Sequence, residues 1–424
     1  MLNSFLQKLK MVVMDRSLRN KLLFIVAALL IFRLVGNIPV PGVDQARLAA
    51  FLSGSQFFSL LNLFSGGGLH NLSVLMLGVG PFITASIILQ LLTMIFPKLK
   101  EMYQEEGEAG RLKFAQYSRL LSVPLAALQG FGLLFLLHQQ NVLITQSFFA
   151  QSVNVIIVTA GALFTMWLGE LMTEYGVGNG ISLLIFAGII ARFPTDIAQL
   201  SYTFTPADLP MYIVFAIVGI IIIAGVVYIS EAERPIPVTY AKRVRGMKVY
   251  GGTSTYLPLR VNQSGVMPII FALSILLFPQ MIASFLAGFT NTVALSVAAF
   301  LKTLMENQLV YGLLYFILVF LFTYFYTAVT FDPDQIATNL QKSGAFVPGV
   351  RPGQSTSSYL AKILVRITLV GAIFLAIIAV LPLILQGITG TQALAIGGTS
   401  LLIVVSVVID FVKQLEAQLS MREY

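Results

Sequence analysis

The sequence predicts an all-α polytopic membrane protein with ten transmembrane helices, and three observations support that fold class. Hydrophobic residues make up 57% of the 424 residues and charged residues only 10%, a composition typical of chains that cross a bilayer repeatedly. Ten apolar stretches approach the roughly 20 residues that a helix needs to span the hydrocarbon core. Lysine and arginine gather in alternate connections between these stretches, as the positive-inside rule requires.

The predicted spans follow one another along the whole chain, and the fifth is short. They lie at roughly 22–36, 73–96, 118–138, 153–173, 180–193, 211–230, 264–287, 309–330, 361–385 and 395–412. Arg33 is the one charge that we expect to be clearly buried in them. Ion-coupled transporters place acids, histidines or lysines near mid-membrane, so the sequence favours a passage that does not depend on titration. The first span lacks a small-residue cleavage site, and we expect no cleavable signal peptide.

The distribution of basic residues predicts the topology. Of the 26 lysines and arginines, 22 fall in the N-terminal arm, in the connections after the second, sixth and eighth spans, or in the tail. Ten spans return the chain to its starting side, so both termini are predicted to be cytoplasmic. The arm covers residues 1–21 and is expected to be amphipathic, and the tail covers 413–424.

The spans divide into two halves of five, 22–200 and 201–412. An odd number of spans gives the halves opposite orientations, as in inverted-topology repeats, although no residue-level repeat is visible. Two cytoplasmic connections, 231–261 and 331–358, are too long to be simple linkers. Prolines and glycines flank short β-prone runs in the first, which predicts a protruding hairpin. The second is predicted to be an ordered but irregular loop.

A short apolar segment, 57–64, precedes the second span and is followed by a serine and three glycines. Eight residues are too few to cross a bilayer as a helix. The segment could be a re-entrant plug on a glycine hinge or a helix lying on the surface, because irregular backbone at membrane depth must be enclosed by protein or line a cavity.

Catalysis is not predicted. The chain has no cysteine and only two histidines, and these lie far apart in the sequence. No catalytic triad, metal cluster, phosphate-binding loop or paired intramembrane carboxylates are recognisable, so we expect no metal, no cofactor and no enzyme activity. Energy for transport must then come from a partner or from the membrane potential.

Several motifs stand in order over essentially the whole chain. They are Phe64-Ser65-Gly66-Gly67, Leu77 to Leu92, Gly176-Val177-Gly178-Asn179-Gly180-Ile181-Ser182, Tyr240-Ala241-Lys242-Arg243, Lys342 to Gly353, and Gly397-Gly398-Thr399-Ser400-Leu401-Leu402-Ile403. In their residues, order and spacing these motifs resemble the SecY family, the channel subunits of the bacterial Sec protein translocase.

The resemblance implies a central hourglass pore that is closed at its waist by aliphatic side chains, with the plug helix beneath it. The ring positions are Val79, Ile83, Ile181, Ile185, Ile270 and Ile403, and the plug at about 57–68 includes Phe57, Leu60, Leu61, Phe64, Gly66 and Gly67. Residues four apart share a helix face, and aliphatic constrictions gate by dewetting. Position 79 is valine where isoleucine is common, so we expect a slightly looser collar. Without the resemblance, each of these residues reads as ordinary helix packing.

The resemblance also implies a lateral gate between the second and seventh spans. Polar residues that could hydrogen-bond across this seam are Thr84, Ser86, Gln90, Asn262, Gln263 and Ser264. Such bonds are worth about 0.6–2 kcal/mol each, weak enough to open for a signal peptide. The same residues could equally form simple bonds at a fixed helix interface.

The basic residues of the long cytoplasmic loops are expected to dock a cytosolic partner. These residues are Lys242, Arg243, Arg245, Lys248 and Arg351. The family implies a ribosome, whose RNA phosphates attract cations, or the SecA motor ATPase, together with SecE-like and SecG-like small subunits. Nascent polypeptides, signal peptides and anionic lipids complete the expected partners.

The function that follows is a protein-conducting channel of the bacterial inner (plasma) membrane, which moves unfolded secretory polypeptides across and releases transmembrane segments sideways into lipid. Two alternatives stay open at this point. A secondary transporter of a small solute shares the inverted-repeat design, and a scaffold without a continuous pore would make the ring residues inert to mutation.

Overall fold

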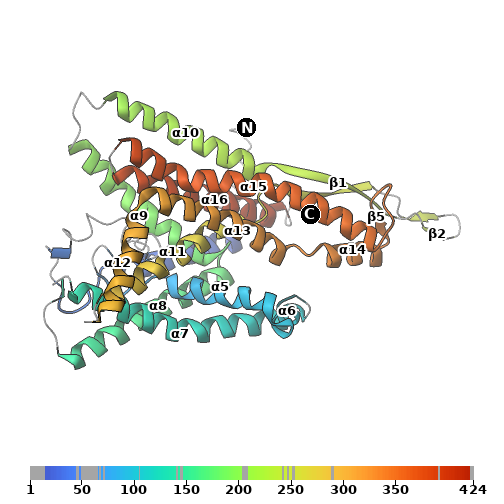
Figure 1. The fold of residues 1–424 in the computed structure, drawn as a ribbon. Helices are drawn as coiled ribbons and strands as arrows, with labels where there is room; N and C mark the ends of the chain where they lie inside the picture. The colour runs from blue at the N-terminus through green and yellow to red at the C-terminus, as the bar shows by residue number, and fades with distance from the viewer. Residues whose placement is uncertain are drawn as a thin grey trace.

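A computed structural model describes residues 15–43, 47–48, 65, 68–69, 72–104, 106–139, 142–143, 147–202, 209–240, 243–245, 248–250, 254–287, 291–389 and 392–420. Long helices run side by side through the body of the molecule, and strands project from one end of the bundle (Figure 1). The helices before the long connection are α2 (Arg16–Val35), α5 (Gly80–Ile95), α6 (Pro97–Gln104), α7 (Gly107–Gln139), α8 (Phe148–Tyr175), α9 (Gly180–Tyr202) and α10 (Leu209–Glu231). The helices after it are α11 (Met267–Leu286), α12 (Thr292–Glu306), α13 (Gln308–Thr330), α14 (Pro333–Lys342), α15 (Gln354–Thr389) and α16 (Gln392–Ser420).

Each of the ten predicted spans overlaps one helix, from α2 to α16. By length and composition, four helical stretches in the described residues can cross a bilayer, or five if the bent pair α5–α6 counts as one. The four are Gly107–His138, Phe148–Tyr175, Gln308–Lys342 and Gln354–Ile384. The chain therefore has several membrane-length apolar helices, while the count of ten spans, the hourglass and the inverted halves stay predictions.

Two predicted boundaries were wrong. The second span was expected from residue 73, but residues 74–79 form turns and the helix α5 begins at Gly80. Gly78 has a φ of 52°, a left-handed conformation that breaks a helix, and Pro81 suits a first helical turn because it has no N–H to leave unpaired. The fifth span was expected to end at 193, but α9 continues through Pro194 to Tyr202, since a proline removes one backbone bond without ending every helix.

The hairpin predicted in the connection 231–261 is confirmed. Strands β1 (Glu233–Tyr240) and β4 (Ser254–Arg260) pair antiparallel, with Glu233 opposite Arg260 and Thr239 opposite Ser254. Between them, β2 (Arg243–Arg245) and β3 (Lys248–Tyr250) form a second small ribbon. The fold is thus mostly helical, with strands in the long connections.

The connection 331–358 was predicted to be irregular, and this was wrong. It contains α14, whose first turn is capped by the side chain of Asp332, which accepts from the N–H groups of Asp334 and Gln335. It also contains β5 (Ala345–Phe346), which pairs antiparallel with β1. The sheet order β4-β1-β5 joins the two long connections into one unit.

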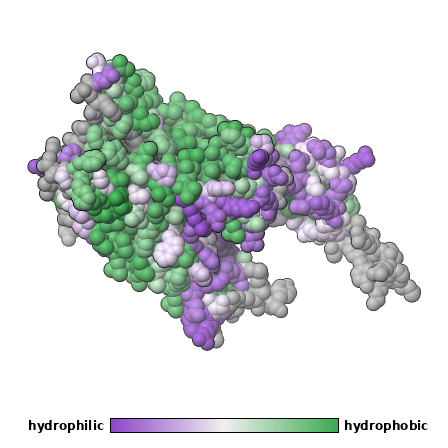
Figure 2. All heavy atoms as spheres, turned by 90° about the horizontal axis from the view of Figure 1, so that it is seen from below, coloured by the Kyte–Doolittle hydropathy of each residue, from purple (hydrophilic) through white to green (hydrophobic). Residues whose placement is uncertain are grey.

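Three hydrophobic clusters organise the packing. The largest joins α2, α5, α8, α9, α10, α11, α13, α15 and α16 in the centre of the bundle. A second lies between α7, α8 and the turns before α5. A third holds the sheet onto α15, through residues such as Ile236, Val347 and Leu360. Outside these cores, hydrophobic residues cover most of the visible body and hydrophilic ones gather toward the end that carries the strands (Figure 2).

Candidate functional site

The predicted ring residues meet in the central cluster. Val79 directly precedes α5, and Ile185, Ile270 and Ile403 come from α9, α11 and α16. With Ile83 of α5 they are at most 5% exposed and belong to one hydrophobic cluster. Helices far apart in the sequence therefore bring five of the six residues into a common aliphatic core.

The sixth ring residue, Ile181, lies at the edge of this core. It is only partly buried and packs against the cluster. A Cβ added to Gly169 of α8 would lie 2.9 Å from Ile181 Cγ1, so this side chain rests on α8. Its neighbour Gly180 approaches α8 even more closely, because a Cβ there would lie 2.1 Å from the Gly169 carbonyl oxygen. Only glycine permits that approach.

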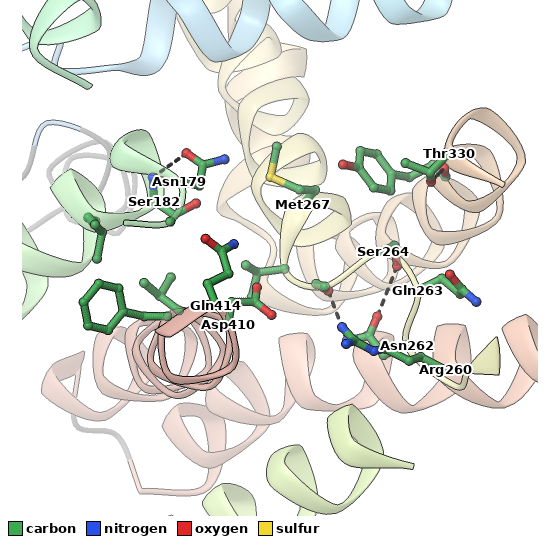
Figure 3. A pocket seen from close by; sticks show the side chains of 17 residues that line it. Asn179, Ser182, Arg260, Asn262, Gln263, Ser264, Met267, Thr330, Asp410 and Gln414 are labelled. Carbon is green, nitrogen blue, oxygen red and sulfur yellow. Dashed lines mark hydrogen bonds between the residues drawn. The ribbon is translucent and has the colours of Figure 1, made fainter. Parts of the chain in front are cut away.

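A polar cavity of about 260 Å³ opens next to the aliphatic core. Leu183, Val266 and Val407 line the cavity and also belong to the central cluster, so one wall of the cavity is the core itself. Figure 3 shows Gln414 and Asp410 projecting from α16 toward the cavity, with Met267 of α11 facing them.

Amide and hydroxyl groups make up much of the remaining lining. Asn179 caps α9, where its Oδ1 accepts from the N–H groups of Ile181 at 3.0 Å and Ser182 at 3.2 Å. Other polar lining residues are Arg260, Asn262, Gln263, Ser264, Tyr326 and Thr330. Asp410 and Gln414 were not among the site residues predicted from the sequence. Asp410 stands inside the predicted tenth span, where an acid is costly and marks function by default, so a usable indication was present.

The predicted gate residues lie on α5 and on the turn before α11, and these two helices contact each other. Thr84, Asn262 and Ser264 are buried. Asn262 Nδ2 donates to the Gly265 carbonyl at 3.2 Å, and Ser264 Oγ donates to Asn262 Oδ1 at 3.2 Å. Among the described residues, none of the hydrogen bonds of these side chains crosses the seam.

Gln90 of α5 differs from the other gate residues. Its Oε1 atom is buried and has no hydrogen-bond partner among the described residues. A buried amide oxygen without a partner costs about 1–3 kcal/mol. Ser86 and Gln263 are half-buried, and the gate role of all six residues stays a prediction.

The predicted plug residues Phe57, Leu60, Leu61, Phe64, Gly66 and Gly67 lie outside the described residues. Within the predicted plug range 57–68, the structure describes Ser65 and Gly68. Ser65 is buried, and its Oγ accepts from the N–H of Leu69 at 3.1 Å. Gly68 is enclosed as well, since a Cβ there would lie 2.9 Å from the Leu75 carbonyl oxygen.

The predicted docking residues fall on the projecting strands and the turn beside them. Lys242 lies outside the described residues, while Arg243, Arg245 and Lys248 belong to β2 and β3. Arg245 pairs with Lys248, and Arg243 is two residues from Arg245. All three positions therefore fall on one face of the ribbon, because strand residues alternate between faces and opposite residues share one.

Arg351, the fifth docking residue, is exposed in an ordered turn. Its carbonyl accepts from Thr356 Oγ1 at 3.0 Å. Gly349 and Gly353 on either side have φ values of 81° and 98°, a conformation that favours glycine. Pairing of β5 with β1 keeps this turn on the same unit as the hairpin.

Ion pairs fasten helices near the end of the bundle that carries the strands. Arg119 Nε of α7 lies 2.6 Å from Glu170 Oε1 of α8, and Lys413 Nζ of α16 lies 2.8 Å from Glu231 Oε1 of α10. Within the described parts of the chain, no three acidic, histidine or cysteine side chains gather as a metal site would need.

Several apolar helices around a buried aliphatic core, opened on one side by a polar cavity, define a multi-pass helical membrane protein. The SecY family profile matches residues 73–412. The protein translocase subunit SecY of Mycobacterium bovis is 43% identical over 447 aligned residues, which cover 100% of this chain and 99% of the relative. The chain belongs to the SecY family.

Solved structures share the fold at low sequence identity. A structure described as that of a protein-conducting channel has a TM-score of 0.66 at 18% identity. The match covers 96% of this chain and 94% of the chain in that structure. Canine Sec61 in a ribosome-channel complex from the endoplasmic reticulum has a TM-score of 0.62 at 17% identity, with the same coverage.

Proposed function

We propose that this chain is the channel subunit of a protein translocase, through which unfolded polypeptides cross the membrane. One observation carries the proposal. Aliphatic residues from α5, α9, α11 and α16 converge in a single buried core, and a polar cavity lined by α9, α11 and α16 adjoins that core.

The chemistry of the two parts suits an unfolded chain. An aliphatic waist excludes water and ions by dewetting and needs no charged filter. The cavity offers amide and hydroxyl groups such as Asn179, Ser182 and Gln414, which can bond to a polypeptide backbone whatever its side chains are. A substrate would thus be held by its backbone before its side chains displace the aliphatic collar.

The contact between α5 and α11 is the proposed lateral gate. Thr84, Ser86 and Gln90 lie on one side and Asn262, Gln263 and Ser264 on the other. Hydrogen bonds of the second group stay within their own turn, so opening the seam need not break them. The partnerless oxygen of Gln90 would gain a donor when a signal peptide intercalates.

The projecting unit of β1, β4, β5 and the β2–β3 ribbon is the proposed docking surface for a cytosolic partner. The strand positions of Arg243, Arg245 and Lys248 share a face of the ribbon, and clustered basic residues attract nucleic-acid phosphates or an acidic protein surface. The canine neighbour was solved with a ribosome, which supports a ribosome as one such partner. SecA, SecE-like and SecG-like subunits, anionic lipids and the proton-motive force belong to the same proposal.

The remaining parts of the proposal are the plug and the cellular location. Segment 57–68 is proposed to seal the waist, and the protein is proposed to act in the bacterial inner membrane with both termini in the cytoplasm. The small-solute transporter considered as an alternative is set aside, because the full-length relatives in this family are protein translocase subunits.

Cysteine crosslinking tests the proposal, and the absence of native cysteine makes single-cysteine variants clean. Cysteines at Ile83 and Ile185 are offered to a stalled secretory chain that carries one cysteine. Matched controls are Met94 of α5 and Ile190 of α9, which are 65% and 45% exposed on the same two helices.

We expect substrate adducts at Ile83 and Ile185 and none at Met94 and Ile190. Adducts at a hairpin position together with none at Ile83 and Ile185 would show that the substrate reaches the protein without passing the aliphatic core, and the channel would then lie elsewhere.

A further inference from the structure

Helix α12 (Thr292–Glu306) is a feature that the proposed function does not use. It lies at the end of the bundle opposite the strands and runs across the direction of α7, α8 and α15 (Figure 1). By the topology predicted from the basic residues, this is the extracytoplasmic end. At 15 residues it is about 22 Å long, which is too short to span a hydrocarbon core of about 30 Å.

The two ends of α12 are fixed by asparagines. Asn291 caps its first turn and accepts from the N–H of Val293 at 3.0 Å. Asn307 follows its last turn and caps α13, accepting from the N–H groups of Leu309 and Val310. These caps separate α12 from its neighbours, so it is an independent crosswise helix and not an interrupted part of a span.

The residues of α12 sort into three faces. One face packs on α11 and α13 and includes the buried Ala298 and Met305. A neighbouring face is apolar yet exposed, with Val293 at 70% and Phe300 at 65%. At 100° per residue, these side chains and the exposed Val297 cover one narrow stripe.

The third face of α12 is mainly polar and borders the apolar stripe. It carries Thr292, Ser296, Lys302 and Thr303, all exposed, together with Leu295, which is 44% exposed. A helix with one apolar and one polar exposed face is suited to a membrane–water interface, with its apolar face about 5–10 Å below the headgroups.

We propose that α12 lies in the extracytoplasmic membrane interface, where Val293, Val297 and Phe300 contact the acyl chains of that leaflet. Continuity with the apolar surface selects lipid as the occupant. Ile282 near the end of α11 and Leu313 near the start of α13 are also exposed, at 49% and 63%, and both helices contact α12. The α12 stripe thus extends an apolar surface that the neighbouring helices already present.

Tryptophan fluorescence tests this placement. The chain has a single tryptophan, Trp167, so a Trp167→Phe background is silent. The reporter is Phe300→Trp on the apolar stripe. The matched control is Ala299→Trp, because Ala299 is the adjacent residue and is exposed on the polar side of the helix. The full-length protein is reconstituted into vesicles, both alone and with its co-purifying subunits.

For Phe300→Trp we expect stronger quenching by lipids brominated near the headgroup than by lipids brominated near the chain end, and weak quenching by aqueous iodide. For Ala299→Trp we expect strong quenching by aqueous iodide and weak quenching by the brominated lipids. Val293→Trp repeats the first reporter, should Phe300→Trp fail to fold.

Three results would overturn the proposal. Maximal quenching of both stripe reporters by the deep bromines would mean that α12 is inserted in the membrane. Iodide quenching of all three reporters without bromolipid quenching would mean that it lies in water. Loss of the bromolipid quenching in the complete complex would mean that a protein subunit covers the stripe.

Discussion

The close packing of α8 against the turns that lead into α5 makes a sharp prediction for Gly161. A Cβ at this position would lie 2.0 Å from the Val74 carbonyl oxygen and 2.8 Å from the Val74 carbonyl carbon. An ordinary contact needs about 3.5 Å, so Gly161→Ala requires a backbone displacement of about 1.5 Å. Overpacking of this kind costs about 1–3 kcal/mol, and a backbone obstacle belongs at the upper end of that range.

The helix propensity of alanine offsets part of this cost. Replacing a helical glycine with alanine gains about 1 kcal/mol, which leaves a net loss of about 2 kcal/mol for Gly161→Ala. Gly219 of α10 is the matched control, because a Cβ there would meet nothing within 4 Å. Gly219→Ala should therefore raise the stability by up to about 1 kcal/mol.

The measurement is the fraction of protein that stays monodisperse in size-exclusion chromatography after stepwise heating in detergent. Thiol-reactive dyes cannot report unfolding here because the chain has no cysteine. We expect Gly219→Ala to survive to a temperature at or above that of the wild type, and Gly161→Ala to fail earlier. Equal midpoints for the two variants would refute the close approach of α8 to Val74.

Three further outcomes are expected. Ile185 is 2% exposed, so Ile185→Ser should hydrate the core and raise ion conductance in planar bilayers. Ile190→Ser at the exposed side of the same helix should keep wild-type conductance, and equal leaks would contradict the ring assignment. The partly exposed pair Arg119–Glu170, whose Nε and Oε1 atoms lie 2.6 Å apart, should have a coupling energy of about 0.2–1 kcal/mol. The measurement is a double-mutant cycle of thermal stability with Arg119→Gln and Glu170→Gln. A coupling energy that does not fall at high salt would contradict an ion pair exposed to solvent. Deleting residues 57–67 should make a quiet channel leaky or flickering, and silence of both proteins even with a signal peptide present would argue against a plug.

Length and apolar composition predicted where the helices lie, because burial in lipid imposes both properties on the sequence. They did not predict where α5 begins. Residues 73–79 are as apolar as the helix that follows, and the left-handed conformation of Gly78 decides the boundary. The crosswise helix α12 was missed for a related reason, since a short amphipathic helix has no membrane-length apolar run to announce it.

The sequence of the second long connection contains a helix-start signal that the prediction of an irregular loop overlooked. Asp332 followed by Pro333 is a recognisable helix start, and α14 begins there. The pairing of β5 with β1 could not be predicted, because two residues far along the chain carry no sequence pattern that selects their partner strand. The pairing of the two long connections was therefore visible only in three dimensions.

The candidate site also contains residues that the sequence alone could single out and residues that it could not. Aliphatic ring residues have no chemical character that separates them from other core residues, and the family resemblance alone singled them out. The structure adds that five of them share one core and that Ile181 rests on α8. Asp410 is the opposite case, since an acid in a predicted span was chemically conspicuous and only its place beside the cavity was unknown.

Contacts at the base of the hairpin link the sheet to the helix bundle. Val261 N donates to the Ala232 carbonyl at 2.9 Å, which closes the base of the hairpin where α10 ends and the turn before α11 begins. Gly371 of α15 allows the Val261 carbonyl to approach, since a Cβ there would lie 2.6 Å from that oxygen. Lys413 of α16 is paired with Glu231 at the end of α10.

These contacts connect the proposed docking surface to the helices that bear Ile270 and Ile403, namely α11 and α16. Helix α11 contacts α7 and also α5, which bears Ile83, and helix α16 contacts α9, which bears Ile185. A displacement of the hairpin would reach the α5–α11 contact through the turn before α11, because packed interfaces shift between discrete arrangements and do not deform continuously. Under the proposed function, partner docking would then act on the α5–α11 seam through α11.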